Sequence, residues 1–375
     1  MCLRLRNWVV ISVMVIAACG DSAPAAPRAD PPTGLGTLPP ITAVVAPSTT
    51  TAVTTTTQAP RPPIVLGFAG DVSFTHGLDG TDPLADVAEL LSAPDLTVVN
   101  LETTIAEPDV GAPLDKTYIF RSPPRAVGLL VEAGVDAVSL ANNHTLDYGR
   151  EGLLRTTELL DEADLGYFGA GADRTAAYRP YVAEVGAWTV GFVGLTHVEC
   201  GWVADDLERW PESAWTCPGF ERQTLAAVAD ASRVADLVVV MVHWGIELDH
   251  CPQPYQRDLA ADWIEAGADL VIGSHPHVLQ GVEQIGDGWV VHSTGNFVFP
   301  SARGPSARTA FMTATISEEA ISLHATPIEI AAGRPRAMGP TASADMLADL
   351  GRWSFGWQFD AATGTVSADG EGICG

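Results

Sequence analysis

The stretch IVLGFAGD, residues 64–71, decides the fold of this 375-residue chain. Its apolar run at residues 64–69 predicts a buried strand, and the Gly70-Asp71 pair predicts a turn that carries a carboxylate. Four further buried strands are expected downstream, at residues 96–100, 137–140, 237–242 and 270–272. Amphipathic helices are expected between them, at residues 83–91, 124–133, 151–163, 221–234 and 253–266. This alternation is typical of an α/β fold.

The C-terminal part of the chain shows a different pattern. Short apolar runs follow one another with little helix between them, at residues 281–285, 289–293, 310–316 and 321–328. Since strands joined by short connections pair antiparallel, we expect an antiparallel portion beside the parallel one. Two packed β-sheets flanked by helices satisfy both patterns.

Metal-capable side chains follow each predicted strand of the α/β part. They are Asp71, Glu102, Asn143 with His144, His243, and His275 with His277. Because ligands of α/β proteins gather at the carboxyl ends of strands, we expect these side chains to share one site. Each residue alone has an ordinary explanation, such as a turn aspartate, a surface carboxylate or a core histidine. Their recurrence at five strand ends favours the common site.

The composition of this set predicts its chemistry. Carboxylate, amide and imidazole ligands without a thiolate suit a divalent ion such as Mn, Zn or Fe. The set exceeds what one tetrahedral ion takes, so we expect two ions, about 3.5–4 Å apart and bridged by a carboxylate. Such a pair lowers the pKa of bound water, and the expected reaction is metal-assisted hydrolysis.

The N-terminus carries an export signal. Arg4 and Arg6 precede an apolar run that is about half of the ~20 residues needed to span a bilayer, so residues 1–18 are expected to be a signal peptide. Residues 16–19, Ile-Ala-Ala-Cys, resemble a bacterial lipobox, in which Cys19 is the site of lipid attachment. We therefore expect an exported lipoprotein anchored on the extracytoplasmic face of the cell membrane. The alternative is an ordinary secretory signal with a chance cysteine.

A linker and one domain are expected after the signal. Residues 19–63 are rich in Pro, Thr and Ala and carry too little apolar surface to form a core, which predicts a disordered stalk. Residues 64–375 contain no second linker of this kind and are expected to form one domain. The formal net charge of -26 disfavours nucleic acid and anionic lipid as partners. A polyanionic substrate would need metal ions or a basic patch to offset the repulsion.

Four cysteines fall in the expected domain, and an even number outside the cytoplasm indicates disulfides. Cys200 and Cys217 lie in one Trp- and Gly-rich insertion and are the expected pair, which leaves Cys251 with Cys374. The sequence leaves the connectivity open. A cysteine-ligated zinc is the alternative, although no C-x-x-C spacing supports it.

Six ordered motifs resemble the CapA family of poly-γ-glutamate capsule synthesis proteins. They are Gly70-Asp71, Asn100-Leu101-Glu102, residues 141–144 with Asp147 and Gly149, His243-Trp244-Gly245 with Glu247, residues 273–277, and residues 293–297. The motifs lie within residues 67–300, and the resemblance fades beyond them. That family is related to calcineurin-like metallophosphatases, which implies a four-layer α/β sandwich of two sheets between helices.

The resemblance also implies a role for each site residue. Asp71 and His277 would bind the first metal ion, and Glu102 would bridge the two ions. The second ion would be bound by Asn143, His243 and His275. His144 would act as general acid or electrostatic stabiliser, oriented by Asp147. Ser73 stands where metallophosphatases have the histidine of an Asp-x-His element, and His76 is too far along to replace it, so phosphatase activity does not follow.

Family membership implies work on poly-γ-glutamate or another envelope polymer, beside membrane-bound synthase subunits. The favoured hypothesis is a metal-dependent hydrolase that cleaves or transfers an amide or phosphoester bond during polymer synthesis or export. One alternative is a non-catalytic, metal-dependent scaffold that holds a carboxylate-rich polymer. Another is an envelope phosphodiesterase unrelated to capsule, because a fold does not determine a substrate.

Overall fold

The computed structural model describes residues 60–75, 82–203 and 210–374. The chain divides into two units, Met1–Thr57 and Gln58–Gly375, and the described residues all belong to the second. The expected signal peptide, Cys19, His76 and most of the expected linker lie outside the described residues. Near the start of the second unit, Arg61 pairs with Asp236 (2.9 Å) and stacks on the Trp188 ring (3.7 Å).

One sheet has eight strands and contains the N-terminal half of the fold. Its order is β16 (Arg334–Ala337), β15 (Ile321–Ala331), β14 (Arg308–Ile316), β1 (Ile64–Val72), β2 (Leu96–Leu101), β5 (Ala137–Ser139) and β6 (Gly166–Phe168), with β13 (Asn296–Val298) paired to β1. The strands β1, β2, β5 and β6 are parallel. The strands β14, β15 and β16 add antiparallel pairs, as the C-terminal pattern predicted.

The second sheet has six strands. Its order is β11 (Leu279–Ile285), β12 (Gly288–Thr294), β10 (Leu270–Ser274), β9 (Leu237–His243), β8 (Trp188–Thr196) and β7 (Tyr181–Val185). The central strands are parallel, and β7 and β11 pair antiparallel at the two edges. The central strands β9 and β10 are nearly continuous apolar runs and are buried throughout, as expected for parallel strands covered on both faces.

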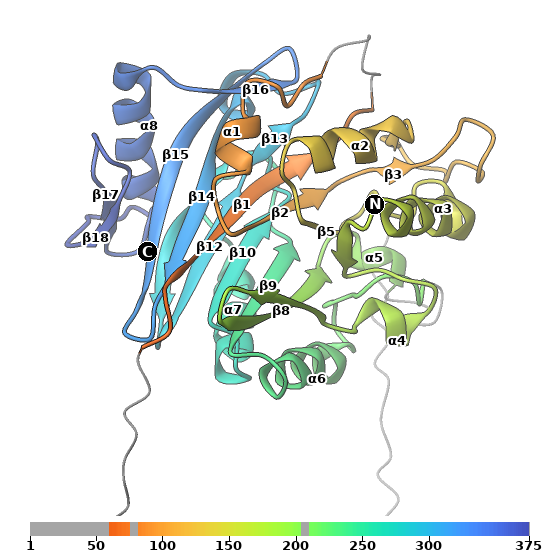
Figure 1. Ribbon diagram of the computed structural model, residues 1–375, viewed down its shortest axis with the longest axis horizontal. Helices are drawn as coiled ribbons and strands as arrows, with labels where there is room; N and C mark the ends of the chain where they lie inside the picture. The colour runs from red at the N-terminus through yellow and green to blue at the C-terminus, as the bar shows by residue number, and fades with distance from the viewer. Residues whose placement is uncertain (1–59, 76–81, 204–209, 375) are drawn as a thin grey trace, which may run out of the picture. The chain divides into compact units, whose positions relative to one another are not determined.

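The two sheets pack face to face, and helices cover their outer faces (Figure 1). Side chains such as Phe68 and Val98 of the first sheet share a core with Val239 and Ile272 of the second. The outer face of the first sheet is covered by α1 (Ala88–Leu91), α2 (Arg125–Glu132) and α3 (Gly149–Glu162). The outer face of the second is covered by α6 (Glu221–Ser232) and α7 (Pro254–Glu265). The predicted four-layer α/β sandwich is confirmed.

Smaller elements complete the described part of the chain. They are β3 (Thr104–Ile105), β4 (Arg121–Ser122), α4 (Arg174–Ala177), α5 (Cys200–Val203), the 3-10 helix η1 (Gly304–Ala307), α8 (Pro340–Trp353), β17 (Trp357–Phe359) and β18 (Val366–Ala368). Disulfides join Cys200 to Cys217 and Cys251 to Cys374, the expected pairing. Within the described ranges, no helix combines the length and apolar character that crossing a bilayer requires.

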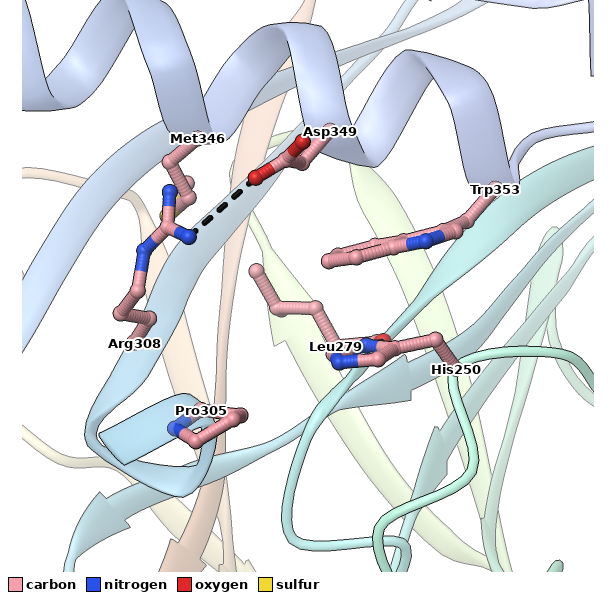
Figure 2. Close-up of a pocket in the computed structure, with 7 residues that line it drawn as sticks. All are labelled: His250, Leu279, Pro305, Arg308, Met346, Asp349 and Trp353. Carbon is pink, nitrogen blue, oxygen red and sulfur yellow. Dashed lines mark hydrogen bonds and ion pairs between the residues drawn. The ribbon is translucent and has the colours of Figure 1, made fainter. Parts of the chain in front are cut away.

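A cavity of about 200 Å³ lies between α8 and the starts of β11 and β14 (Figure 2). Trp353 forms one wall and stacks on the imidazole of His250, with ring centroids 3.8 Å apart. Arg308 and Asp349 face each other across the mouth at 3.2 Å. The charge of Arg308 is therefore compensated by a carboxylate of the same cavity.

Candidate metal centre

The strand registers bring the predicted ligands to one edge of each sheet. Asp71 is paired with Asn100 across β1 and β2, and His243 is paired with Ser274 across β9 and β10. Because all four strands are parallel within their sheets, their carboxyl ends lie together. Contacts between Asp71 and both His243 and His277 show that the edges of the two sheets meet.

Asp71 is fully buried at the centre of this edge. Its Oδ1 accepts a hydrogen bond from Asn100 Nδ2 (2.8 Å), and its Oδ2 lies 3.2 Å from His277 Nδ1. Burial raises the pKa of Asp71, but the His277 hydrogen bond and the charges of His243 and His277 outweigh burial and lower the pKa overall. The Asp71 carboxylate is therefore buried and favours its ionised form, as the predicted role of an oxygen ligand requires.

Glu102 lies between the imidazoles of the site and has no exposed surface. Neither of its carboxylate oxygens has a hydrogen-bond partner in the described part of the chain. Its Oε1 lies 3.3 Å from His243 Nε2 and 3.8 Å from His144 Nε2, and its Oε2 lies 4.0 Å from His277 Nδ1. Since a buried carboxylate without a partner costs several kcal/mol, this arrangement fits a cation bound between the imidazoles and the carboxylate.

His243 and Asn143 present acceptor atoms to the same point. His243 Nδ1 lies 2.9 Å from Ser274 Oγ, and His243 Nε2 lies 2.9 Å from Asn143 Oδ1. In the tautomer that carries its proton on Nδ1, the histidine would direct the Nε2 lone pair at the amide oxygen and at Glu102 Oε1 (3.3 Å). His243 Nε2, Asn143 Oδ1 and Glu102 Oε1 would then be three acceptors that repel one another. A divalent ion bound between them would remove this repulsion by accepting all three as ligands.

His275 and His277 follow β10 in a strained turn. Their φ angles are 95° and 57°, in the left-handed region that non-glycine residues rarely adopt. Strain of this kind persists where the surrounding structure holds a functional geometry. The turn brings one ligand atom each of Glu102, His275 and His277 within 4.8 Å of one another, which is compatible with a shared ion.

The two imidazoles have opposite protonation preferences. Burial lowers the pKa of His275 well below its usual range, and the neighbouring His243 and His277 lower it further. Burial also lowers the pKa of His277, but Glu102 and Asp71 outweigh it and raise the pKa to about 10. In the absence of a metal ion, a proton on His277 thus compensates the two carboxylates.

His144 and Asp147 form a pair beside the ligand cluster. His144 Nδ1 lies 2.6 Å from Asp147 Oδ2, and the ring stacks on Phe120 with centroids 3.9 Å apart. Asp147 is fully buried and also accepts the Phe120 backbone N–H (2.6 Å). With Nδ1 bonded to Asp147, the Nε2 atom faces the site, where it is available to give or take a proton.

All eight predicted residues thus lie at one site, within direct contact of at least one other member of the set. Their individual roles as ligands or as acid remain predictions. The site residues are Asp71, Glu102, Asn143, His144, Asp147, His243, His275 and His277.

Ser73 does not reach the site as a substitute for the missing histidine. Its hydroxyl hydrogen-bonds Thr75, and its backbone N–H donates to Val298 O (2.7 Å). The amide of Asn296 does reach the site, because its Oδ1 lies 2.8 Å from His277 Nδ1. Its place after a predicted strand had indicated Asn296 as a site-lining amide, whereas the supporting contacts of Asn100 and Ser274 came from the structure.

Gly70 explains how Asp71 reaches the site. A Cβ at this position would lie 1.8 Å from Gly295 O, so only glycine permits the approach. The approach allows Asp71 N–H to donate to Gly295 O (2.9 Å), which joins β1 to the turn before β13. Asp71 and Asn296 are therefore positioned by one backbone contact.

Comparison with known proteins identifies a family and several curated relatives. The family model "Bacterial capsule synthesis protein PGA_cap" matches residues 55–301. The capsule biosynthesis protein CapA of Bacillus anthracis is 33% identical over 224 residues, which cover 59% of this chain and 54% of that protein. The PGA biosynthesis protein CapA of Bacillus subtilis is 28% identical over 240 residues, which cover 62% of each chain. The chain thus spans less than two thirds of the length of these curated relatives.

Among solved structures, a phosphatase from Mycoplasma pneumoniae is similar to 72% of this chain, over 94% of its own length. The TM-score is 0.47 and the sequence identity is 14%. The family match spans the whole set of site residues, from Asp71 to His277. This chain belongs to the bacterial capsule synthesis protein PGA_cap family.

Proposed function

We propose that this protein acts in poly-γ-glutamate synthesis or export at the cell envelope, through a dinuclear-metal hydrolase-type site. The site would cleave or transfer an amide or phosphoester bond. The observation that carries the proposal is the buried Glu102 carboxylate, which has no hydrogen-bond partner and faces three imidazoles. Curated relatives named for capsule and PGA biosynthesis support the choice of polymer.

Two groups of residues would hold the ions, with Glu102 between them. Asp71 and His277 form one group, and Asn143, His243 and His275 form the other. When bound, two ions of Mn, Zn or Fe would act as Lewis acids on a substrate oxygen and lower the pKa of water.

His144 is the group placed to move a proton at the leaving atom. Its Nδ1 lies 2.6 Å from Asp147 Oδ2, and this hydrogen bond determines the orientation of the ring and favours a proton on Nδ1. Its Nε2 is directed toward Glu102, at 3.8 Å, and hence toward the ligand cluster. Protonated at Nε2, His144 would donate to the departing nitrogen or oxygen of the broken bond.

The acidic character of the chain makes polymer binding dependent on the ions. A carboxylate-rich polymer is repelled by a protein of net charge -26, and divalent ions at the site would offset that repulsion locally. Anchoring through a lipid on Cys19 would keep the domain beside membrane-bound synthase subunits on the extracytoplasmic face. These placements belong to the proposal.

A non-catalytic scaffold is the second candidate, and Ser73 favours it. The side chain that stands in place of a metallophosphatase histidine bonds Thr75 instead of the site, so the first ion would have fewer nitrogen ligands. A more weakly held ion could still bridge the protein to a polymer carboxylate without turning over substrate.

Metal content and turnover separate these candidates. The full chain, purified without chelator, is analysed by elemental mass spectrometry together with Glu102→Ala and His275→Ala. The matched controls are Glu329→Ala and His324→Ala on β15, outside the site. The proposal expects about two equivalents of a transition metal in the wild type and the controls, and fewer in the two site variants.

Turnover is then followed with poly-γ-glutamate, by chain length, and with bis(p-nitrophenyl) phosphate. Polymer shortening that needs metal and Glu102 supports the proposal. Metal binding without any turnover supports the scaffold. Hydrolysis of the phosphodiester alone supports an envelope phosphodiesterase unrelated to capsule, and absence of metal uptake would refute all three metal-dependent functions.

A further inference from the structure

Lys116 is the only lysine in the chain, and its side chain is buried next to the site. It lies in the loop between β3 and β4, and only 5% of the side chain is exposed. Lysine is rarely buried unless its charge is paired, because removing an ammonium group from water is costly. The position therefore calls for a specific set of partners.

Three acceptors surround the Lys116 ammonium group. Its Nζ lies 2.5 Å from the backbone oxygen of Asn143, 3.0 Å from Asp147 Oδ1 and 3.3 Å from Glu199 Oε1. An ammonium group has three N–H donors, so it can bind several acceptors at once. Two of these three acceptors belong to the segment that carries the proposed ligand Asn143 and the proposed acid His144.

From these contacts we infer that Lys116 is a positioning residue of the site, which holds the loop of Asn143 and aligns His144 through Asp147. The inference rests on the proposed function, in which His144 gives a proton to the leaving group. Asp147 Oδ1 is bound by Lys116, and Asp147 Oδ2 is bound by His144 Nδ1 and by the Phe120 N–H. Each carboxylate oxygen thus has its own donors, which leaves the aspartate one orientation.

Glu199, the third partner of Lys116, lies in a segment that follows a strand of the second sheet. Glu199 begins the insertion closed by the Cys200–Cys217 disulfide, and it adopts a φ of 62°. The nearby His197 N–H donates to His243 O at the end of β9 (2.9 Å). Lys116 therefore joins the loop after β5 in the first sheet to the segment after β8 in the second. The contact between Lys116 and Glu199 therefore ties the insertion to the site.

A kinetic test distinguishes positioning from a general loss of structure. Lys116→Met, Lys116→Arg and Glu199→Gln are compared with wild type as full-length, metal-loaded proteins. The probes are bis(p-nitrophenyl) phosphate, with a good leaving group, and diphenyl phosphate, with a poor one. Acid catalysis matters most for the poor leaving group, and such catalysis contributes about 10²–10⁴-fold.

For Lys116→Met we expect kcat on diphenyl phosphate to fall about 10²-fold, with a fall of less than about tenfold on the nitrophenyl ester and KM nearly unchanged. Lys116→Arg should recover part of the lost kcat, because it restores the charge. Glu199→Gln should have the smallest effect, because it contacts the acid only through Lys116. An equal loss on both substrates would overturn the inference.

A second readout does not depend on turnover. In zinc-loaded protein with ¹⁵N-labelled histidine, the His144 Nδ1–H bonded to Asp147 should give a slowly exchanging, downfield proton signal. The signal should be lost or shifted in Lys116→Met and retained in Glu199→Gln, while circular dichroism and zinc content stay unchanged. An unaltered signal in Lys116→Met contradicts the positioning role even if wild type proves inactive, and inactivity alone counts against the proposed function.

If Lys116→Met does not fold, Lys116→Arg decides the question with the same signal. A guanidinium group keeps the charge but not the tetrahedral donor geometry, so the His144 proton should shift without being lost. A signal identical to that of wild type in a folded Lys116→Arg variant would contradict the inference.

Discussion

Two buried histidine–carboxylate clusters of this protein differ in how their carboxylates are satisfied. Glu283, on the edge strand β11 of the second sheet, accepts from His292 Nε2 of the neighbouring β12 (3.1 Å) and from Arg257 Nε of α7 (2.8 Å). Glu102 faces imidazoles at 3.3, 3.8 and 4.0 Å but accepts no hydrogen bond. Each cluster contains one imidazole nitrogen without a partner, on His292 and on His275, so the difference lies in the carboxylates.

The comparison teaches what separates a structural pair from a candidate metal centre. Arg257 gives the first cluster its own counter-ion, and the pKa of Glu283 reflects this. Burial raises that pKa, but the hydrogen bonds from His292 and Arg257 outweigh it and lower the pKa to about 2. Within the described residues, no arginine or lysine forms an ion pair with Glu102, and a bound cation would compensate its charge.

The sharpest test of the comparison exchanges each glutamate for glutamine. Glu102→Gln should reduce bound metal below one equivalent and lower metal-dependent hydrolysis by about 10³-fold or more, because a bridging carboxylate stabilises charge at both ions. Elemental analysis and steady-state kinetics measure the two effects. Full metal content in Glu102→Gln would show that the unsatisfied carboxylate is not a ligand.

Asp147→Asn tests a residue that lies beside the Glu102 cluster and contacts it through His144. We expect metal content to remain near that of wild type, while kcat falls about 10²-fold because His144 loses the acceptor that orients it. Kinetics with metal analysis on the same preparation checks this. A loss of metal equal to the loss of kcat would instead place Asp147 among the groups that hold the ions.

Glu283→Gln should show the opposite behaviour from Glu102→Gln. Metal content and kcat should stay at wild-type values, while the free energy of unfolding falls by about 1–3 kcal/mol, because the charged hydrogen bonds of Arg257 and His292 lose their carboxylate. Urea unfolding with and without metal measures the change. Loss of metal in this variant would remove the distinction between the clusters.

The smallest expected effect is a pH dependence specific to Glu283. Its pKa is about 2 in the folded protein against an ordinary value of 4.5, so its stabilisation is complete above pH 4.5 and is lost as pH falls toward 2. The stability difference between wild type and Glu283→Gln should therefore shrink between pH 6 and pH 3 in urea unfolding. A constant difference would mean that the carboxylate is not the stabilising species.

The parallel part of the fold could be predicted because its signals are local. Apolar runs followed by glycine and polar residues mark β1, β2, β5, β9 and β10, and in parallel sheets such ends share an edge. Elements with weaker patterns were missed, including β7, β8 and α8. The short strand β18 (Val366–Ala368), which pairs with β17, was also not predicted, whereas the bond between Cys374 and Cys251 was.

The sequence by itself determined the fold class and the eight polar side chains of the site, because residue type and position after a strand are written locally. Tertiary structure alone decided that Lys116 and Glu199 belong beside them. Lys116 lies 27 residues before Asn143 and 31 before Asp147, in a loop without a motif. Likewise, Glu283 and Glu102 are the same residue type in sequence. Only the packing of the fold places an arginine beside Glu283 and leaves the Glu102 carboxylate without a hydrogen bond, where a cation would bind.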